Sequence, residues 1–486
     1  MNKMIKANNK CGRGELVTRG GFIKCLAGLT LSGCATLGKD EQCALSFGVV
    51  SDIHVTTPAS CAMFERALRY FKQRGADAVM IPGDLTDWGL KSSLGYVADT
   101  WKRVFGGTDA VPLFVTGNHD YDGWAYHDMT MEMHANGYSE QEALTKLGLA
   151  NEWRAAFGEE FGGVRLRTVK GYQFLSCEYY ATLNNELEKW LAANKHLLDK
   201  GKPFFFFQHL QIKETTADSF VSWSDKGVTK PLLSSFANCI AFTGHAHHSS
   251  NDECSLWQED SFTAVACPSL SYCDYGLEDY ENGADARSPK ALKTMPNEQL
   301  RRDLRGGQGY FVRVYASRVE IERVDIEELA SDCAPWVVST SHERPTQNAQ
   351  AARAAAEPVP EWPLGTRVKI QTRNTERRNG SWAIVWDCRF PAATIAHGHR
   401  VKDYELRLVR TNGEVALTKR FLPTAFCKMK KFEPAVERVW FNVDEVPEGE
   451  DLTLELRARN YFNKYSQPII AAQKLHAIPG REKAQK

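Results

Sequence analysis

The chain has 486 residues, which is more than a single domain usually contains, and 43% of them are hydrophobic, enough for sizeable cores. Its 60 basic residues balance its 60 acidic residues. A neutral chain without a basic stripe lacks the electrostatic footprint of a sequence-independent nucleic-acid binder, so we expect no nucleic-acid-binding surface.

The N-terminus is typical of an exported protein. A basic start that extends to Arg19 precedes the apolar run Phe22–Leu31, which is too short for a spanning helix of about 20 residues. The run ends in Leu-Ser-Gly-Cys at Cys34, which resembles the lipobox of bacterial lipoproteins. The resemblance implies that residues 1–34 are a lipoprotein-type signal peptide and that a lipidated Cys34 anchors the protein to a membrane of the cell envelope, periplasmic or at the cell surface. An ordinary signal peptide is the alternative, and the sequence leaves the export route open.

Five short polar motifs, each directly after an apolar run, carry the strongest functional signal in the chain. The motifs are Asp52-Ile53-His54, Gly83-Asp84, Gly117-Asn118-His119-Asp120, Gln208-His209 and Gly244-His245-Ala246-His247. The preceding runs are almost continuously apolar, as expected of strands that are buried on both faces. These runs are Phe47–Val50, Ala78–Ile81, Leu113–Val115, Phe204–Phe207 and Ile240–Phe242.

The spacing of the motifs indicates β-α-β units. The distance along the chain is 32 residues from Asp52 to Asp84 and 34 residues from Asp84 to Asn118, long enough for a loop, a helix and the next strand. The segment Ala62–Arg74 has apolar residues at helical spacing and is the first predicted helix. Because the carboxyl ends of parallel strands converge on a crevice, we expect the motifs to meet along one edge of a sheet.

The residue types in these motifs suit a particular kind of metal site. Carboxylate, imidazole and amide oxygen favour Zn, Fe or Mn, whereas structural zinc sites are rich in thiolates. No pair of cysteines with metal-ligand spacing competes for this role. Each motif alone is more often a turn or a solvated loop, but five in order at strand ends indicate a metal site.

In this order the motifs resemble the signature of the calcineurin-like metallophosphoesterase superfamily, D-x-H, G-D, G-N-H-[DE], H and G-H-x-H. The resemblance covers residues 45–326, which end in the predicted strands Gly309–Val314 and Arg318–Asp325. It implies an α/β metallophosphoesterase fold, with β-sheets flanked by helices in an α/β/β/α sandwich, and a site for two divalent metal ions, Mn, Fe or Zn. The implied ligands are Asp52, His54 and His247 for the first ion, Asn118, His209 and His245 for the second, and Asp84 as the bridge between both.

The resemblance also implies an activity. Two cations about 4 Å apart can clamp the attacking and leaving oxygens of a phosphoryl displacement and generate hydroxide near neutral pH. We therefore expect a metal-dependent hydrolase that cleaves a small phosphate-ester substrate by metal-activated water attack, with phosphodiesters slightly preferred. A phosphomonoesterase or nucleotidase is one alternative, and a non-catalytic surface binding protein that retains the metal site is another.

Residues beside the implied ligands have predicted roles as well. His119 is the predicted catalytic residue, which would stabilise the transition state and protonate the leaving oxygen. Asp120 either orients His119 or caps the start of a helix. Gln208 could form a hydrogen bond that orients a metal ligand, whereas His248 is expected to be exposed.

Beyond Ile326 the pattern changes. Residues 327–363 are polar, rich in alanine and then punctuated by proline, which predicts a linker with room for a short helix within Ala349–Ala356. Residues 364–475 contain six or seven short alternating segments, which predict an all-β sandwich. These segments are Arg367–Gln371, Ser381–Trp386, Tyr404–Val409, Val415–Phe421, Val439–Val443 and Leu452–Arg459.

The end of this region, Asp451–Pro468, resembles the closing hairpin of a fibronectin type III domain, with Trp386 as the expected core aromatic residue. His397 and His399 flank a glycine and are interpreted as surface-loop residues, not metal ligands. We expect the region to space the enzyme from the membrane or to bind a surface partner.

Overall fold

The structure is a computed structural model and describes most of the chain from Glu41 onward. The described residues are 41–121, 136, 137, 139, 142, 148–216, 224–259, 262–273, 281, 307–331, 333–340, 349–376, 380–424, 426, 436–447 and 451–476. From Gln42 onward the chain forms one compact unit. The predicted signal peptide, including Cys34, lies outside the described residues. Among the described residues no helix is long and apolar enough to cross a membrane.

A first sheet of six strands has the order β12-β11-β10-β1-β2-β3. Its strands are β1 (Leu45–Val49), β2 (Ala78–Pro82), β3 (Val111–Val115), β10 (Gln308–Val314), β11 (Arg318–Asp325) and β12 (Trp336–Ser339). β1, β2 and β3 are parallel, and β10 to β12 continue the sheet antiparallel from β1. Helices α1 (Cys61–Gln73) and α2 (Lys91–Phe105) connect the three parallel strands, so the predicted β-α-β units are confirmed.

A second sheet of six strands has the order β4-β5-β6-β7-β9-β8. Its strands are β4 (Val164–Val169), β5 (Tyr172–Cys177), β6 (Phe204–Gln208), β7 (Cys239–Thr243), β8 (Leu256–Glu259) and β9 (Phe262–Ala266). Among the described residues of this part of the chain, the α-helices are α6 (Leu149–Phe157), α7 (Tyr179–Leu183), α8 (Glu186–Asn194) and α9 (Thr229–Leu233). β5, β6, β7 and β9 are parallel, while β4 and β8 pair antiparallel at the two edges.

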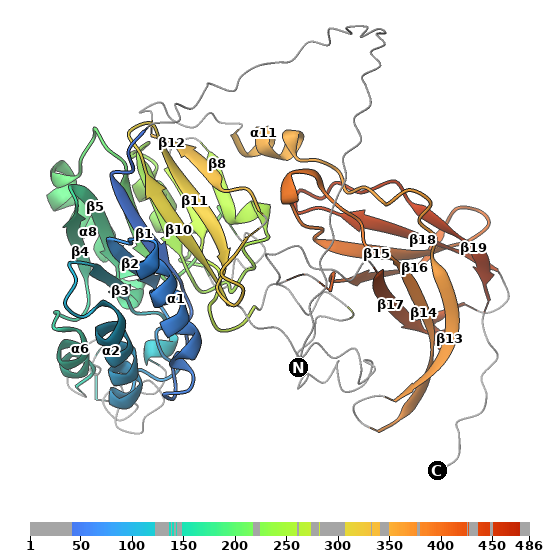
Figure 1. Cartoon of the computed structure of the whole chain (residues 1–486), viewed down its shortest axis with the longest axis horizontal. Helices are drawn as coiled ribbons and strands as arrows, with labels where there is room; N and C mark the ends of the chain where they lie inside the picture. The colour runs from blue at the N-terminus through green and yellow to red at the C-terminus, as the bar shows by residue number, and fades with distance from the viewer. Residues whose placement is uncertain are drawn as a thin grey trace, which may run out of the picture. The chain divides into compact units, whose positions relative to one another are not determined.

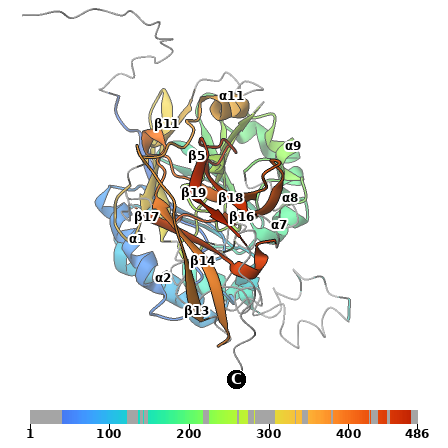
Figure 2. The same cartoon turned by 90° about the vertical axis from the view of Figure 1, so that its right-hand side faces the viewer.

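The two sheets pack against each other, and helices cover their outer faces. Phe205 and Phe207 of β6 meet Phe47 of β1 in the core between the sheets, whereas Phe204 and Phe206 pack on the side of α8. The outer face of β2 packs against α1 and α2. Figure 2 shows α1 and α2 in blue on one side and α7, α8 and α9 in green on the other. The predicted α/β/β/α architecture is therefore confirmed, and burial on both faces explains why the strands are almost continuously apolar.

The expectation that all the motifs meet along one edge of a single sheet was wrong. The first three motifs follow β1, β2 and β3 of the first sheet, and the last two follow β6 and β7 of the second. A strand buried on both faces carries an apolar pattern that says nothing about its neighbours, so the sequence could not assign strands to sheets.

Residues 327–363, predicted as a linker, contain a strand and a helix. Strand β12 pairs with β11 and extends the first sheet, burying Trp336 and Val338 while Val337 is exposed. Figure 1 shows β12 and β11 beside β10. Helix α11 (Ala349–Ala356) coincides with the short helix for which the sequence left room.

Residues 364–475 form two antiparallel sheets, β13-β14-β17 and β16-β15-β18-β19. Their strands are β13 (Lys369–Glu376), β14 (Trp382–Pro391), β15 (Asp403–Val409), β16 (Val415–Phe421), β17 (Val436–Asn442), β18 (Leu452–Arg459) and β19 (Ile469–Leu475). Side chains from both sheets share one core, in which Trp386 is buried as predicted beside Leu406 and Leu454. The predicted all-β sandwich is confirmed.

Candidate metal centre

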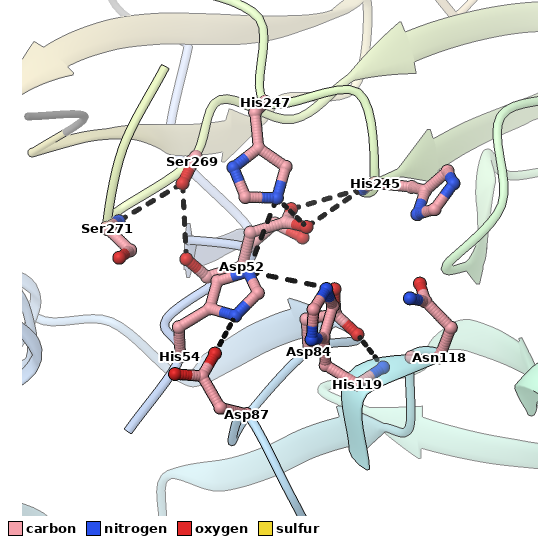
Figure 3. A network of polar contacts seen from close by, with 12 residues as sticks. Asp52, His54, Asp84, Asp87, Asn118, His119, His245, His247, Ser269 and Ser271 are labelled. Atoms are coloured by element: carbon pink, nitrogen blue, oxygen red, sulfur yellow. Dashed lines mark hydrogen bonds and ion pairs between the residues drawn. The ribbon is translucent and has the colours of Figure 1, made fainter. Parts of the chain in front are cut away.

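All seven implied ligands lie in loops that directly follow strands. Asp52 and His54 follow β1, Asp84 follows β2, Asn118 follows β3, His209 follows β6, and His245 and His247 follow β7. Figure 3 shows the side chains from these loops converging, with His54 and His247 beside Asp52, and His245 and Asn118 on the other side of Asp84. The structure thus brings together residues from two sheets.

The first group contains the residues implied for the first ion. Asp52, His54, Asp84 and His247 each offer a ligand atom, and these atoms lie within 4.8 Å of one another. His247 Nε2 is 3.1 Å from Asp52 Oδ1 and 3.3 Å from His54 Nε2. All four residues are buried, so a cation there would be largely shielded from solvent.

The second group contains the residues implied for the second ion. Ligand atoms of Asp84, His209 and His245 also lie within 4.8 Å of one another. His209 Nε2 is 3.0 Å from Asn118 Oδ1, 3.1 Å from His245 Nδ1 and 3.3 Å from Asp84 Oδ2. Asn118 therefore joins this group through its amide oxygen.

Asp84 belongs to both groups, and one of its oxygens fits a bridging role. Asp84 Oδ1 accepts a hydrogen bond from the backbone N–H of His119 at 3.0 Å. The other oxygen, Oδ2, is buried without a hydrogen-bond donor, and His54 Nε2 and His209 Nε2 lie 3.7 and 3.3 Å away on its two sides. A buried carboxylate oxygen normally has a donor, so this atom is placed as a ligand for cations. Together with the oxygen and nitrogen donors around it, it fits a pair of divalent ions.

The backbone at the ligands is strained. Five of the seven implied ligands have a positive φ: Asp52, His54, Asp84, His245 and His247. Each such non-glycine residue costs about 1–3 kcal/mol and persists only where the surrounding structure fixes it. Strain of this kind clusters at functional sites, and here it turns the ligand side chains toward one another.

Two glycines of the motifs allow the loops to approach closely. A Cβ atom at Gly117 would lie 2.1 Å from Asp84 Oδ1, and one at Gly244 would lie 2.3 Å from Ser51 Oγ and 2.6 Å from the Pro82 carbonyl oxygen. Neither position has room for a side chain. The glycines are therefore required by close packing at the centre of the site.

Three histidines are oriented through their second ring nitrogen. His54 Nδ1 lies 2.5 Å from Asp87 Oδ1, and the Nδ1 atoms of His209 and His247 lie 2.9 Å from the carbonyl oxygens of Pro82 and Tyr272. Such partners fix the tautomer and the ring orientation of metal-binding histidines. The Tyr272 ring also packs against the His247 ring, with centroids 4.2 Å apart.

Sequence reasoning missed Asp87 and Tyr272 as members of the site. Asp87 lies three residues after Asp84, and this short spacing in the loop after β2 was an available signal. Tyr272 follows Ser269, whose hydroxyl donates to the Asp52 carbonyl oxygen. No local pattern in that loop indicated that it reaches the metal centre.

The charges inside the cluster favour ionised carboxylates. Burial opposes the charge of Asp52, but His247 and His209 outweigh it and lower the pKa of Asp52 to about 2. Burial also opposes the charge of Asp84, and His209 and His54 bring its pKa far below the usual value. In the same way Asp84 outweighs burial and raises the pKa of His209 to about 9. Nearby positive charge stabilises two buried, ionised carboxylates, and cations would supply that charge.

His119 lies beside the first group. Its ring is 4.8 Å from the His54 ring, centroid to centroid, and ligand atoms of His54, Asp87 and His119 lie within 4.8 Å of one another. Asp120 does not serve as a dedicated partner of His119. Its carboxylate accepts hydrogen bonds from the backbone N–H groups of Thr86 at 2.8 Å and Gly117 at 2.9 Å, so it ties the loops after β2 and β3 together at the start of a helix.

Two further expectations for neighbouring residues were wrong or unsupported. His248 is 1% exposed, although the sequence predicted an exposed side chain, because the chain after His247 turns into the protein. Burial lowers the pKa of His248 well below the usual value, and Lys402 and His247 act in the same direction. Gln208 Nε2 donates to the Leu210 carbonyl oxygen at 2.9 Å and Gln208 Oε1 accepts from Thr229, so both ends bond away from the metal ligands.

Residues 45–249 match the family model of the calcineurin-like phosphoesterases. The match supports the predicted superfamily for this segment, and with the buried Asp and His cluster it supports a metal-dependent phosphoesterase with a dinuclear site. No curated protein sequence matches the chain.

Similar solved structures include three with low sequence identity. One is a conserved uncharacterized protein, a predicted phosphoesterase, from Streptococcus pneumoniae TIGR4, with a TM-score of 0.25 and 11% identity over 61% of this chain and 97% of that chain. Another is the purple acid phosphatase PPD1 from yellow lupin (Lupinus luteus) seeds, with a TM-score of 0.37 and 12% identity over 61% of this chain and 53% of that chain. A third is GAP50, the anchor in the inner membrane complex of Plasmodium, with a TM-score of 0.34 and 12% identity over 64% of this chain and 94% of that chain. Identities this low say nothing about substrate.

Proposed function

We propose that this chain hydrolyses phosphate esters with two divalent metal ions, Mn, Fe or Zn, one held by each of the two groups of ligands. The observation that carries the proposal is the position of Asp84. Its Oδ2 atom is buried without a hydrogen-bond donor, and histidines of both groups lie on its two sides. Most buried polar side-chain atoms in proteins have a hydrogen-bond partner, so an orphaned carboxylate oxygen between these histidines favours a role as a metal ligand.

Each residue of the site has its own proposed role. Asp52, His54 and His247 would hold the first ion, Asn118, His209 and His245 the second, and Asp84 both. When bound, the ions would neutralise charge on the phosphoryl oxygens and lower the pKa of a water molecule near the phosphorus. Asp87 and the carbonyl groups of Pro82 and Tyr272 keep three of the histidines in the orientation that this requires.

His119 is proposed as the residue that protonates the leaving oxygen. The ring lies beside His54, close to the first group but outside the implied ligand set. A proton from an imidazole makes an alkoxide or aryloxide a better leaving group, which is needed whether the substrate is a monoester or a diester. We place phosphodiesters slightly ahead of monoesters, because diesterases of this superfamily often carry a histidine at the position of His119, as many of its monoesterases also do.

Hydrolysis of a generic aryl phosphodiester by the chain from Ala35 onward tests the proposal. The protein would be stripped of metal, reloaded with Mn and compared with Asp84→Asn. We expect turnover that depends on Mn and is lost in the variant. Turnover of monoesters alone would reverse the substrate preference, and two bound ions without turnover of either class would favour the alternative of a surface binding protein.

The proposal includes export and a lipid anchor, whose support is the sequence before Ala35. A chain with Cys34→Ala should no longer incorporate labelled fatty acid and should leave the membrane fraction, while its activity stays unchanged. We also propose that residues 364–475 are a fibronectin type III-like module, supported by its sheets of three and four strands with shared core residue Trp386.

A further inference from the structure

The chain directly after the last motif is polar and yet buried. Six successive residues, His248–Glu253, each expose 3% or less of their surface. Loops usually run over the surface because their buried polar groups would need partners. We call residues 248–255 the post-motif loop. Its buried polar groups need hydrogen-bond partners from the segments that cover it.

Part of the cover comes from residues 364–475. Ser249 Oγ and Asn251 Nδ2 both donate hydrogen bonds to the carbonyl oxygen of Phe426, at 3.2 and 2.9 Å. Further along, Cys254 Sγ lies 3.4 Å from the carbonyl oxygen of Tyr461. The C-terminal sandwich thus supplies hydrogen-bond acceptors for polar groups of the post-motif loop.

Glu253 adds a charged contact in the same loop. Its carboxylate accepts a hydrogen bond from Trp336 Nε1 at 2.9 Å and pairs with the buried Arg323. The ring of His399 reaches the same carboxylate, with Nε2 3.7 Å away, and Arg353 of α11 donates to the Glu253 carbonyl oxygen at 2.7 Å. Groups from the first sheet, α11 and the sandwich therefore converge on one residue. His399, which the sequence assigned to a surface loop, is a contact between regions.

The N-terminal end of the post-motif loop directly follows the implied metal ligand His247. Ser249 is two residues after His247, and both His245 and His247 have a positive φ, 71° and 50°. Such conformations persist only when the chain on both sides is held. Strand β7 holds the chain before Gly244, and the contacts of the post-motif loop hold it after His247.

We propose that the C-terminal sandwich is a built-in support of the metal centre, in which Ser249 and Asn251, bonded to Phe426, act as positioning residues for His247. The inference rests on the proposed function, since it concerns the same site. It assigns to the sandwich a role within the enzyme, beyond spacing it from a membrane or binding a surface partner.

The test uses Asn251→Ala in the chain from Ala35 onward, which removes one hydrogen bond to Phe426 and leaves every metal ligand in place. Loss of a group that orients a metal ligand typically costs 10–100-fold in affinity, so we expect the first Mn ion to bind about tenfold more weakly while the second is unchanged. The EPR signal of Mn distinguishes a coupled pair from a single ion. In metal-free protein, the amides of residues 245–249 should exchange hydrogen faster than in the parent. Ser249→Ala, a smaller change, should act in the same direction if Asn251→Ala does not fold.

Leu454→Ala is the matched control, because it destabilises the sandwich core without touching the post-motif loop. It should lower the Tm and leave Mn affinity at 25 °C unchanged, which separates positioning from general stability. Parent-like Mn binding and parent-like exchange in both loop variants would overturn the inference. A parent that binds no ion pair would instead overturn the proposed function, and the exchange rates would still decide the inference.

Discussion

The loops after β1, β2, β3, β6 and β7 differ from the C-terminal sandwich in how their backbone and polar groups are arranged. Of the twelve non-glycine residues with positive φ among the described residues, five are implied metal ligands, whereas the sandwich has two, His397 and Asn463, in its loops. The clusters of potential ligands among the described residues all lie in the first region. The sandwich instead has regular alternation and a shared apolar core.

The two regions contribute differently to the stability of the fold. Strained backbone and buried charge each destabilise the fold, and they persist in the ligand loops because several elements fix them. The sandwich contributes burial of apolar surface with little strain. We therefore expect substitutions in the ligand loops to change metal binding and activity, and substitutions in the sandwich core to change stability.

Asp84→Asn should reduce activity more than about 100-fold, because a bridging ligand matters more than the groups that orient ligands, whose loss costs 10–100-fold. The measurement is kcat/KM for an aryl phosphodiester together with the number of ions bound. Asp99→Asn, at an exposed position of α2, is the control and should resemble the parent. Equal activity of Asp84→Asn and the parent would contradict the assigned role of Asp84.

Gly117→Ala should abolish the binding of the ion pair while the protein stays folded. The added Cβ would lie 2.1 Å from Asp84 Oδ1, so the loop after β3 must move away from the site. Metal content after gel filtration is the measurement. Gly95→Ala in α2 is the matched control because nothing lies within 4 Å of its Cβ, and it should stabilise the protein by about 0.5–1 kcal/mol.

Leu454→Ala should lower the free energy of unfolding by about 2–5 kcal/mol, as expected for a fully buried leucine. Its kcat at 25 °C should equal that of the parent, because the side chain lies in the sandwich core. Denaturant unfolding and steady-state kinetics on the same sample give both values. A lower kcat at unchanged stability would show that the sandwich core affects catalysis, so that the two regions do not respond differently to substitution.

Asp87→Asn should reduce activity or metal affinity about 10–100-fold, since it weakens the contact that orients His54. It should leave the Tm nearly unchanged because the Asp87 side chain is partly exposed, at 34%. A pH–rate profile beside that of the parent would show whether the loss is the same at every pH. Parent-like kinetics across the profile would mean that the backbone alone fixes His54.

Acid should weaken the contacts of Glu253 with Arg323 and His399. This is the smallest of the five expected effects. Burial opposes the charge of Glu253, but Arg323 and His399 outweigh this, so the folded-state pKa lies below the unfolded value of about 4.3. The stabilisation is therefore complete above that value and is lost as pH falls through the folded-state pKa. Unfolding free energies between pH 6 and pH 3 should fall less steeply in Glu253→Gln than in the parent, and identical slopes would contradict this.

The implied ligand set and its order could be predicted from the sequence. The residue types of the five motifs, their place after apolar runs and the spacing between Asp52, Asp84 and Asn118 are local properties that can be counted along the chain. The alternating segments after residue 364 likewise predicted the described sandwich strands except β19, because a period of two residues reflects one buried face.

Three features could not be predicted from the sequence: the assignment of strands to sheets, the groups that orient the implied ligands, and the cover of the post-motif loop. His54 meets His247 across 193 residues, and Ser249 meets Phe426 across 177. Contacts at such separations depend on how whole sheets pack, and no local pattern records them. The chemistry of the site is therefore present in its motifs, while its geometry arises from packing between segments that are far apart in the chain.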